Sequence, residues 1–229
     1  MTKTFSGYLE KDEVRAIIHK MEDVSRHPYR DSLLLELLWQ TGCRIGEAVQ
    51  LVPERVGYSS IILHNLKQRK VKKVDGKTVR DDKGKIVREP DTSATKEVEV
   101  TSQLCDAIKQ YCSDNSITKG MWVFSGNLNS SKHMTNWYAW WIITKASEAA
   151  GVFRFGKKNP HTGGRFKGAY PHLFRHSNAM ELLETTGDIS LVKEQLGHSS
   201  IESTQVYAYA KKPKIKKAVK EIDWYGEKS

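Results

Sequence analysis

The stretch His172-Leu173-Phe174-Arg175-His176 places two histidines and an arginine within two turns of a predicted helix. Residues three and four positions apart share a helix face, so these three side chains are expected to surround one point. The planar arginine fork suits a phosphate oxygen, and histidine can move a proton near neutral pH. The alternative explanation is a capped helix start with a buried, hydrogen-bonded histidine. Whether these residues form a phosphate site or only a helix start depends on which other functional residues the chain supplies.

Two more stretches complete a pattern suited to attack on a phosphodiester. Far upstream, Thr41-Gly42-Cys43-Arg44-Ile45-Gly46-Glu47 supplies a second arginine in the connection that enters a short helix. Downstream, Leu196-Gly197-His198 predicts a helix end followed by a turn, and Tyr207 lies on the next predicted helix. Tyr209 would point to nearly the opposite face, since each helical residue turns by about 100°. Only one of the two tyrosines can therefore face the site, and its spacing from His198 favours Tyr207.

A metal site is the main rival explanation for the histidine pair. His172 and His176 are four residues apart, as in zinc proteases, but Leu173 stands where such enzymes carry their glutamate. No nearby cysteine or carboxylate completes a ligand set. The three cysteines lack metal-site spacing, and their odd number argues against a disulfide framework. We expect reduced thiols, no metal and no cofactor.

Composition and charge predict a nucleic-acid-binding protein of the cytoplasm. The 229-residue chain has a net charge of +10, and no apolar run or signal peptide suggests a membrane or export. The region 67–88 has ten Lys or Arg against three Asp, residues 149–180 contain no acid, and 211–220 adds six lysines. Such runs attract a polyanion through long-range fields and counterion release. The predicted partner is a nucleic acid, and we expect a protein associated with the nucleoid.

The pattern of apolar residues predicts an α+β fold that is mainly helical, with one small antiparallel sheet. The strands are expected at 60–66 and 97–101, joined by a long basic hairpin extension with turns at 75–76 and 83–84. A short apolar piece is noted at 122–124, and 152–170 is expected to be a basic loop. Helices are expected at about 9–24, 29–41, 46–51, 102–114, 134–150, 171–186, 190–196 and 201–209, with a lysine-rich one after Pro213.

These linked motifs resemble the catalytic domain of the tyrosine recombinase (phage integrase) family over about residues 8–210. The resemblance rests on 41–48, on 172–176 and on 196–207, in that order, with 187–192 between the last two. It implies site-specific recombination through a 3′-phosphotyrosine intermediate, without ATP or metal. Two other functions stay open, a resealing enzyme like a type IB topoisomerase and a DNA-binding module without strand cleavage.

The resemblance also implies roles for particular residues. Arg44 and Arg175 would be the catalytic arginines, His172 and His198 the histidines, and Tyr207 the nucleophile. The family's lysine on the first hairpin strand is expected at Lys67, with Lys96 on the returning strand as the alternative. The candidate DNA-binding residues are the cations of the extension and of the basic loop, namely Arg69, Lys70, Lys72, Lys73, Lys157, Lys158, Arg165 and Lys167.

The resemblance predicts how the chain is organised and assembles. Residues 1–210 would form the catalytic domain, with an insertion at about 68–95, and 211–229 a basic tail that docks in cis or on a neighbouring subunit. The usual N-terminal DNA-clamping domain is expected to be absent. Family members work as tetramers on DNA, so we expect a homotetramer there, with accessory DNA-bending proteins as further partners. A phage, plasmid or transposon origin is consistent with this family.

Overall fold

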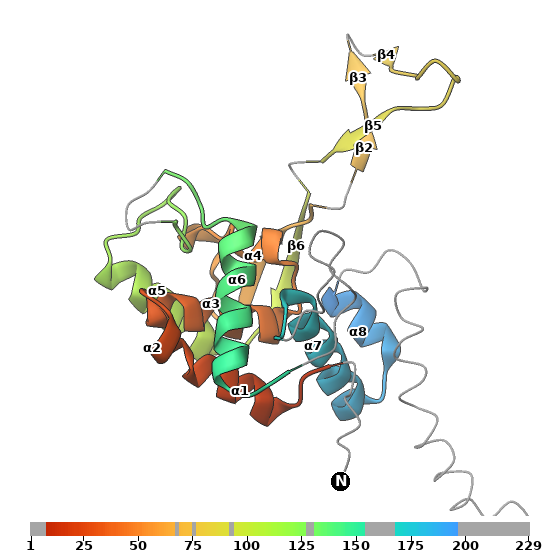
Figure 1. Cartoon of the computed structure of the whole chain (residues 1–229). Coiled ribbons are helices and arrows are strands. Elements are labelled where there is room, and N and C mark those ends of the chain that lie inside the picture. The colour runs from red at the N-terminus through yellow and green to blue at the C-terminus, as the bar shows by residue number, and fades with distance from the viewer. Residues whose placement is uncertain are drawn as a thin grey trace, which may run out of the picture. The chain divides into compact units, whose positions relative to one another are not determined.

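The computed structural model describes residues 8–66, 69–74, 77–91, 94–126, 131–153 and 168–196. The chain divides into two compact units, residues 1–178 and 179–229, which are treated separately below. Figure 1 shows the mainly helical first unit, with short antiparallel ladders as its only strands in the described part of the chain. The predicted α+β class is therefore confirmed, whereas the predicted boundary at residue 210 falls outside the described residues.

The first unit begins with three helices, α1 (Lys11–His19), α2 (Met21–Val24) and α3 (Pro28–Thr41). The single helix predicted at 9–24 is wrong in one respect, because the chain breaks at Lys20 between α1 and α2. Ile17 and Met21 are nevertheless both buried, so the apolar face continues across the break and the pattern alone does not reveal it.

Gly42 ends α3 and turns the chain toward the site. Its φ of 59° lies in the left-handed region that glycine adopts without steric cost, and its N–H donates to the Leu38 carbonyl at 3.0 Å. Arg44 is the residue just before α4 (Ile45–Ala48), which is shorter than the predicted 46–51. A 3₁₀ turn, η1 (Pro53–Arg55), follows.

Strands β1 (Ser60–His64) and β6 (Thr95–Glu99) form the predicted antiparallel pair, in a register that places Leu63 opposite Lys96. The extension between them continues outward in Figure 1 as two further short ladders. Its tip is a turn in which Asp81 Oδ1 accepts the N–H groups of Lys83 and Lys85. The ladders pair β2 (Arg69–Val71) with β5 (Arg88–Pro90), and β3 (Lys73–Val74) with β4 (Lys77–Thr78).

Two longer helices complete the core of the first unit. α5 (Ser102–Asp114) and α6 (Asn136–Ala149) each begin with a threonine, Thr101 and Thr135, whose hydroxyl accepts a backbone N–H of the first turn. α6 contacts α1, α2, α3 and α4. The apolar piece at 122–124 forms no strand, but Val123 and Phe124 are fully buried in the same core.

Gly168 brings the chain close to α6 just before α7 (Pro171–Thr186). A Cβ at this position would lie 2.8 Å from both the carbonyl oxygen and Cγ2 of Thr144, so only glycine fits without a shift. Gly168 also bridges to Phe153 in antiparallel fashion. This approach determines where the first turn of α7, with His172, begins.

The second unit starts within α7. Gly187, with φ of 70°, ends that helix as predicted, and Asp188 Oδ1 accepts the N–H of Ser190 at the start of α8 (Ile189–Leu196). Val192 and Leu196 are fully buried. No helix in the described part of the chain is long and apolar enough to cross a membrane.

Candidate active site

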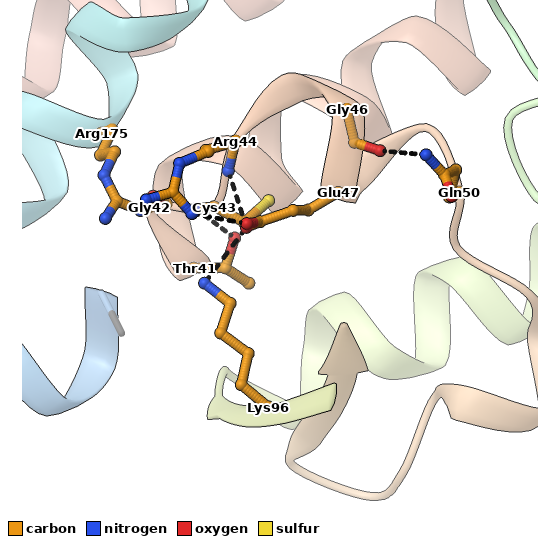
Figure 2. A network of polar contacts seen from close by, with 9 residues as sticks. All are labelled: Thr41, Gly42, Cys43, Arg44, Gly46, Glu47, Gln50, Lys96 and Arg175. Atoms are coloured by element: carbon orange, nitrogen blue, oxygen red, sulfur yellow. Dashed lines mark hydrogen bonds and ion pairs between the residues drawn. The ribbon is translucent and has the colours of Figure 1, made fainter. Parts of the chain in front are cut away.

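Two stretches far apart in the sequence meet at Arg175. This side chain is only 6% exposed, and its Nη1 donates to the Gly42 carbonyl, 133 residues away in the sequence. Gly42 is two residues before Arg44, so the contact brings the two predicted arginines to one place. Figure 2 draws Arg175, Gly42 and Arg44 in one network of polar contacts.

Glu47 holds Arg44 from the first turn of α4. The Arg44 Nη1 donates to Glu47 Oε1 at 2.7 Å, and the Arg44 backbone N–H donates to Oε2 at 3.1 Å. The Glu47 side chain is fully buried, whereas that of Arg44 remains 19% exposed. The guanidinium is thus oriented by one carboxylate and keeps part of its surface accessible.

Lys96 reaches the same carboxylate from strand β6. Its Nζ lies 3.2 Å from Glu47 Oε2 as a close ion pair, although the alignment falls short of a hydrogen bond. The Lys96 side chain is 12% exposed. One buried anion therefore binds two cations (Figure 2), and the cluster retains an excess of positive charge.

The pKa values around this cluster follow from its charges. Burial acts to raise the pKa of Glu47, but the Lys96 charge and the hydrogen bonds from Arg44 outweigh it and hold that pKa below its usual value. Burial raises the pKa of the Cys43 thiol to about 11. Glu47 is consequently a permanent anion, and Cys43 is a neutral packing residue beside it.

The histidines occupy different positions on the first turns of α7. His172 is exposed, while His176 is partly buried. Burial lowers the pKa of His176, and the nearby charges of His172 and Arg175 lower it further. His172 is therefore the more accessible imidazole of the pair, and its role in proton transfer stays a prediction.

A cavity of about 520 Å³ opens beside these groups, and both Arg44 and His172 line it. The other described residues of its lining are mainly apolar or aromatic and include no carboxylate; they are Cys43, Ile45, Gly46, Leu66, Asn136, Trp137, Trp140, Tyr170 and Pro171. A bound anion in this cavity would meet a guanidinium and an imidazole without a competing negative charge.

Several predicted residues lie outside the described part of the chain. They are Lys67, Lys157, Lys158, Arg165, Lys167, His198 and Tyr207. Of the cations predicted to bind DNA, Lys70, Lys72 and Lys73 are exposed on the extension, and Arg69 lies in strand β2. Among the described residues, no three metal-ligating side chains gather into a site.

Sequence reasoning missed the role of Glu47 and the aromatic wall of the cavity. Glu47 was part of the quoted stretch, and its position three residues after Arg44 could have indicated an ion pair at a helix start. Its contact with Lys96 depends on a strand 49 residues away and has no local sequence signal.

Comparison with known proteins shows the family. The phage integrase family model matches residues 7–213, and the chain belongs to that family. It is 30% identical over 215 residues to the tyrosine recombinase XerD of Staphylococcus epidermidis (strain ATCC 35984), covering 94% of this chain and 62% of the relative. The chain thus spans less than two thirds of the length of the curated relatives that it matches.

Solved structures share the fold. One is the XerH site-specific recombinase bound to difH substrate, with a TM-score of 0.61 and 19% identity over 89% of this chain and 50% of that chain. Another is the catalytic domain of bacteriophage HP1 integrase, with a TM-score of 0.53 and 18% identity over 97% of this chain and 98% of that one. The predicted recombinase catalytic-domain fold is confirmed.

Proposed function

We propose that this protein is a site-specific tyrosine recombinase that cleaves and rejoins DNA strands through a 3′-phosphotyrosine intermediate. The observation that carries the proposal is the Arg175 contact with Gly42, which joins the two arginine motifs at one place. Family membership over residues 7–213 supports the same chemistry.

In the proposed reaction, Arg44 and Arg175 bind the non-bridging oxygens of the scissile phosphate. Negative charge grows on these oxygens in the transition state, and donors already held in place stabilise it without reorganisation. Glu47 orients Arg44 through two hydrogen bonds, and Gly42 orients Arg175. Both guanidinium groups are therefore preorganised.

Tyr207 is the proposed nucleophile. A phenol has a pKa of about 10, so it needs a base and an electropositive site to attack at neutral pH. His172 accepts the tyrosine proton, and His198 donates a hydrogen bond to the phosphate. Attack breaks the bond between phosphorus and the 5′ oxygen, which leaves with a proton from Lys67. The new ester conserves the bond energy, so rejoining requires neither ATP nor metal.

Lys67 is proposed as this acid in preference to Lys96. The Lys96 ammonium is mostly buried, and its Nζ already lies 3.2 Å from Glu47 Oε2. A general acid has to release its proton to the leaving group. Lys96 fits better as the second cation that balances Glu47 and thereby holds Arg44.

The proposed substrate is double-stranded DNA. Its phosphates would meet the cations of the extension, with Arg69, Lys70, Lys72 and Lys73, and those of the basic loop, with Lys157, Lys158, Arg165 and Lys167. We further propose a homotetramer on DNA, in which residues 211–229 dock on a neighbouring subunit, with accessory DNA-bending proteins. Residues 214–222 alternate apolar residues with lysines, which is consistent with an apolar contact to a neighbouring subunit and an electrostatic contact to DNA.

The test is covalent trapping. Duplexes bound by the full chain are first recovered from a randomised library and then offered with a nick beside the cleavage position, so that the released fragment diffuses away. We expect a protein–DNA adduct that resists SDS and is absent in Tyr207→Phe. An adduct of equal yield in that variant would show that Tyr207 is not the nucleophile.

The same assay separates the alternatives. Binding without adduct in the wild type would indicate a DNA-binding module. Adduct with relaxation of supercoiled plasmid, but without exchange between two sites, would indicate a resealing enzyme. Exchange between two plasmids that carry the recovered site is the result expected for a recombinase.

A further inference from the structure

Trp137 is an exposed aromatic residue in the first turn of α6. Its side chain is 68% exposed, and it stacks on Trp141 with ring centroids 6.4 Å apart and planes inclined by 13°. One face of the Trp137 ring therefore packs against Trp141, and most of its remaining surface is exposed to solvent. A large apolar surface held at such a position suits contact with a ligand.

This tryptophan contributes to two cavities of the first unit. The first is the 520 Å³ cavity beside Arg44 and His172. The second, of about 300 Å³, is lined by Val24, Arg26, Trp137, Tyr138 and Trp141. An arginine thus stands in each cavity, with Trp137 common to both.

The start of α6 is held against the first cavity by a close approach. A Cβ on Gly46 would lie 3.3 Å from Leu66 Cδ1 and 3.5 Å from Asn136 Nδ2, both of which line that cavity. α4 and α6 are also in contact. Arg44, just before α4, and Trp137, at the start of α6, are consequently parts of one wall.

The lining chemistry favours a nucleic acid over a protein partner. Among the described residues that line the two cavities there is no carboxylate, and each cavity has a guanidinium. A nucleotide chain alternates phosphates with nucleosides. Arg44 and Arg26 could each bind a phosphate, and Trp137, which lines both cavities, could contact the nucleoside between them. Aromatic side chains bind such groups with little dependence on sequence when they stack, and more selectively when they meet a thymine methyl group.

We propose that Trp137 packs against the nucleoside next to the cleaved phosphate, and that Arg26 binds a phosphate further along the same strand. This inference rests on the proposed function, because Arg44 has to hold the cleaved phosphate for the neighbouring nucleoside to reach Trp137. Trp137 would then be a specificity and positioning residue of the DNA site, with Asn136 beside it as a polar partner for a base edge.

The experiment compares the full chain with its Trp137→Ala and Trp137→Phe variants in selection from a randomised duplex library. The matched control is Tyr58→Ala, because Tyr58 is 77% exposed but lines neither cavity. We expect Trp137→Ala to lose base preference at one position and to bind the wild-type site about 5- to 100-fold more weakly. Trp137→Phe should retain most of both, and Tyr58→Ala should match the wild type.

The outcomes separate this inference from the proposed function. If the wild type recovers no common site, the proposed function fails and this inference fails with it. If the wild type recovers a site and Trp137→Ala recovers the same site with equal affinity, only the role of Trp137 is overturned. The second measurement is sedimentation of the wild type and of Trp137→Ala without DNA. If the wild type forms an oligomer that the variant loses, while DNA binding is unchanged, Trp137 belongs to a protein interface and its proposed role at the DNA is overturned.

Discussion

Cationic side chains occur in two contrasting settings in this protein. In the site, Arg44, Lys96 and Arg175 are at most 19% exposed, and each contacts an oxygen of Glu47 or Gly42. On the extension, Lys72 and Lys73 are exposed, and Lys70 is half-exposed with its Nζ 4.0 Å from Asp91. The same kind of charge is thus held in a defined position in one region and surrounded by water in the other.

The contrast teaches what each region can do. A buried cation costs desolvation free energy unless an anion or a carbonyl compensates it, and the compensating partner also determines its direction. Surface cations are screened by salt and contribute little to folding. Under the proposed function, the site would therefore make precise contact with one phosphate, and the extension electrostatic contact with many.

The largest effect should come from removing the shared anion. Glu47→Gln leaves Arg44 and Lys96 without their counter-charge, so we expect the free energy of unfolding to fall by about 3 kcal/mol. Urea denaturation measures the change. The matched variant on the extension is Asp91→Asn, whose carboxylate lies 4.0 Å from the half-exposed Lys70; it should cost less than Glu47→Gln, because the cation it leaves behind remains hydrated.

A second change at Lys96 sharpens this prediction. In the Glu47→Gln background, Lys96→Met removes one uncompensated cation and should restore part of the lost stability. Equal costs for Glu47→Gln and Asp91→Asn would contradict the distinction between the two settings.

Glycine substitutions should show a smaller difference between the regions. Gly168→Ala forces a Cβ to 2.8 Å from the Thr144 carbonyl oxygen in the core, so it should cost about 1–3 kcal/mol. Gly84, at the tip of the extension, has φ of +74°, but a Cβ added there would meet no atom within 4 Å, so Gly84→Ala should cost only the backbone term, about 1 kcal/mol. Thermal unfolding of both variants provides the comparison, and a larger loss in Gly84→Ala would refute it.

The extension should dominate the salt dependence of DNA binding. Replacing Lys70, Lys72 and Lys73 by alanine should reduce the slope of log K against log salt by about 3, since each lost phosphate contact contributes about 0.9. Stability should stay unchanged. Lys109→Ala with Lys119→Ala, two exposed lysines outside the extension, is the matched control. An unchanged slope in the triple variant would show that DNA does not meet this surface.

The smallest expected effect is a pH dependence at His176. Because burial and the charges of His172 and Arg175 lower its pKa, the unfolded chain binds a proton more readily than the folded one. Above the ordinary pKa of about 6.5, His176 is neutral in both the folded and the unfolded chain and costs no stability. Below that pH the unfolded chain takes up the proton first, so the free energy of unfolding falls as the pH decreases. His176→Gln should lose less stability than the wild type when the pH is lowered from about 7.5 to about 5.5, a window that spans this ordinary pKa, in urea denaturation. A steeper loss in the variant would reverse the sign of this argument.

Local patterns predicted much of the fold. The helices expected at 29–41, 134–150 and 171–186 end close to these bounds, each followed by a glycine with positive φ (Gly42, Gly151 and Gly187), and β1 pairs with β6 as expected. The break at Lys20 and the short α4 were not predictable, because burial continues across them. Likewise, the two arginines were identified from short motifs, whereas Tyr207, His198 and Lys67 remain predictions.

The sequence by itself determined the family and the arginine motifs, because these depend on neighbouring residues along one chain segment. Only the tertiary structure decided that Arg175 donates to Gly42, that Glu47 balances both Arg44 and Lys96, and that Trp137 lies beside Arg44. The physical reason is that the contacts of Arg175 with Gly42 and of Glu47 with Lys96 join residues 133 and 49 positions apart, so they depend on how α4, α7 and β6 pack. The Arg44–Glu47 pair, three residues apart on one helix start, is the local part of the same cluster.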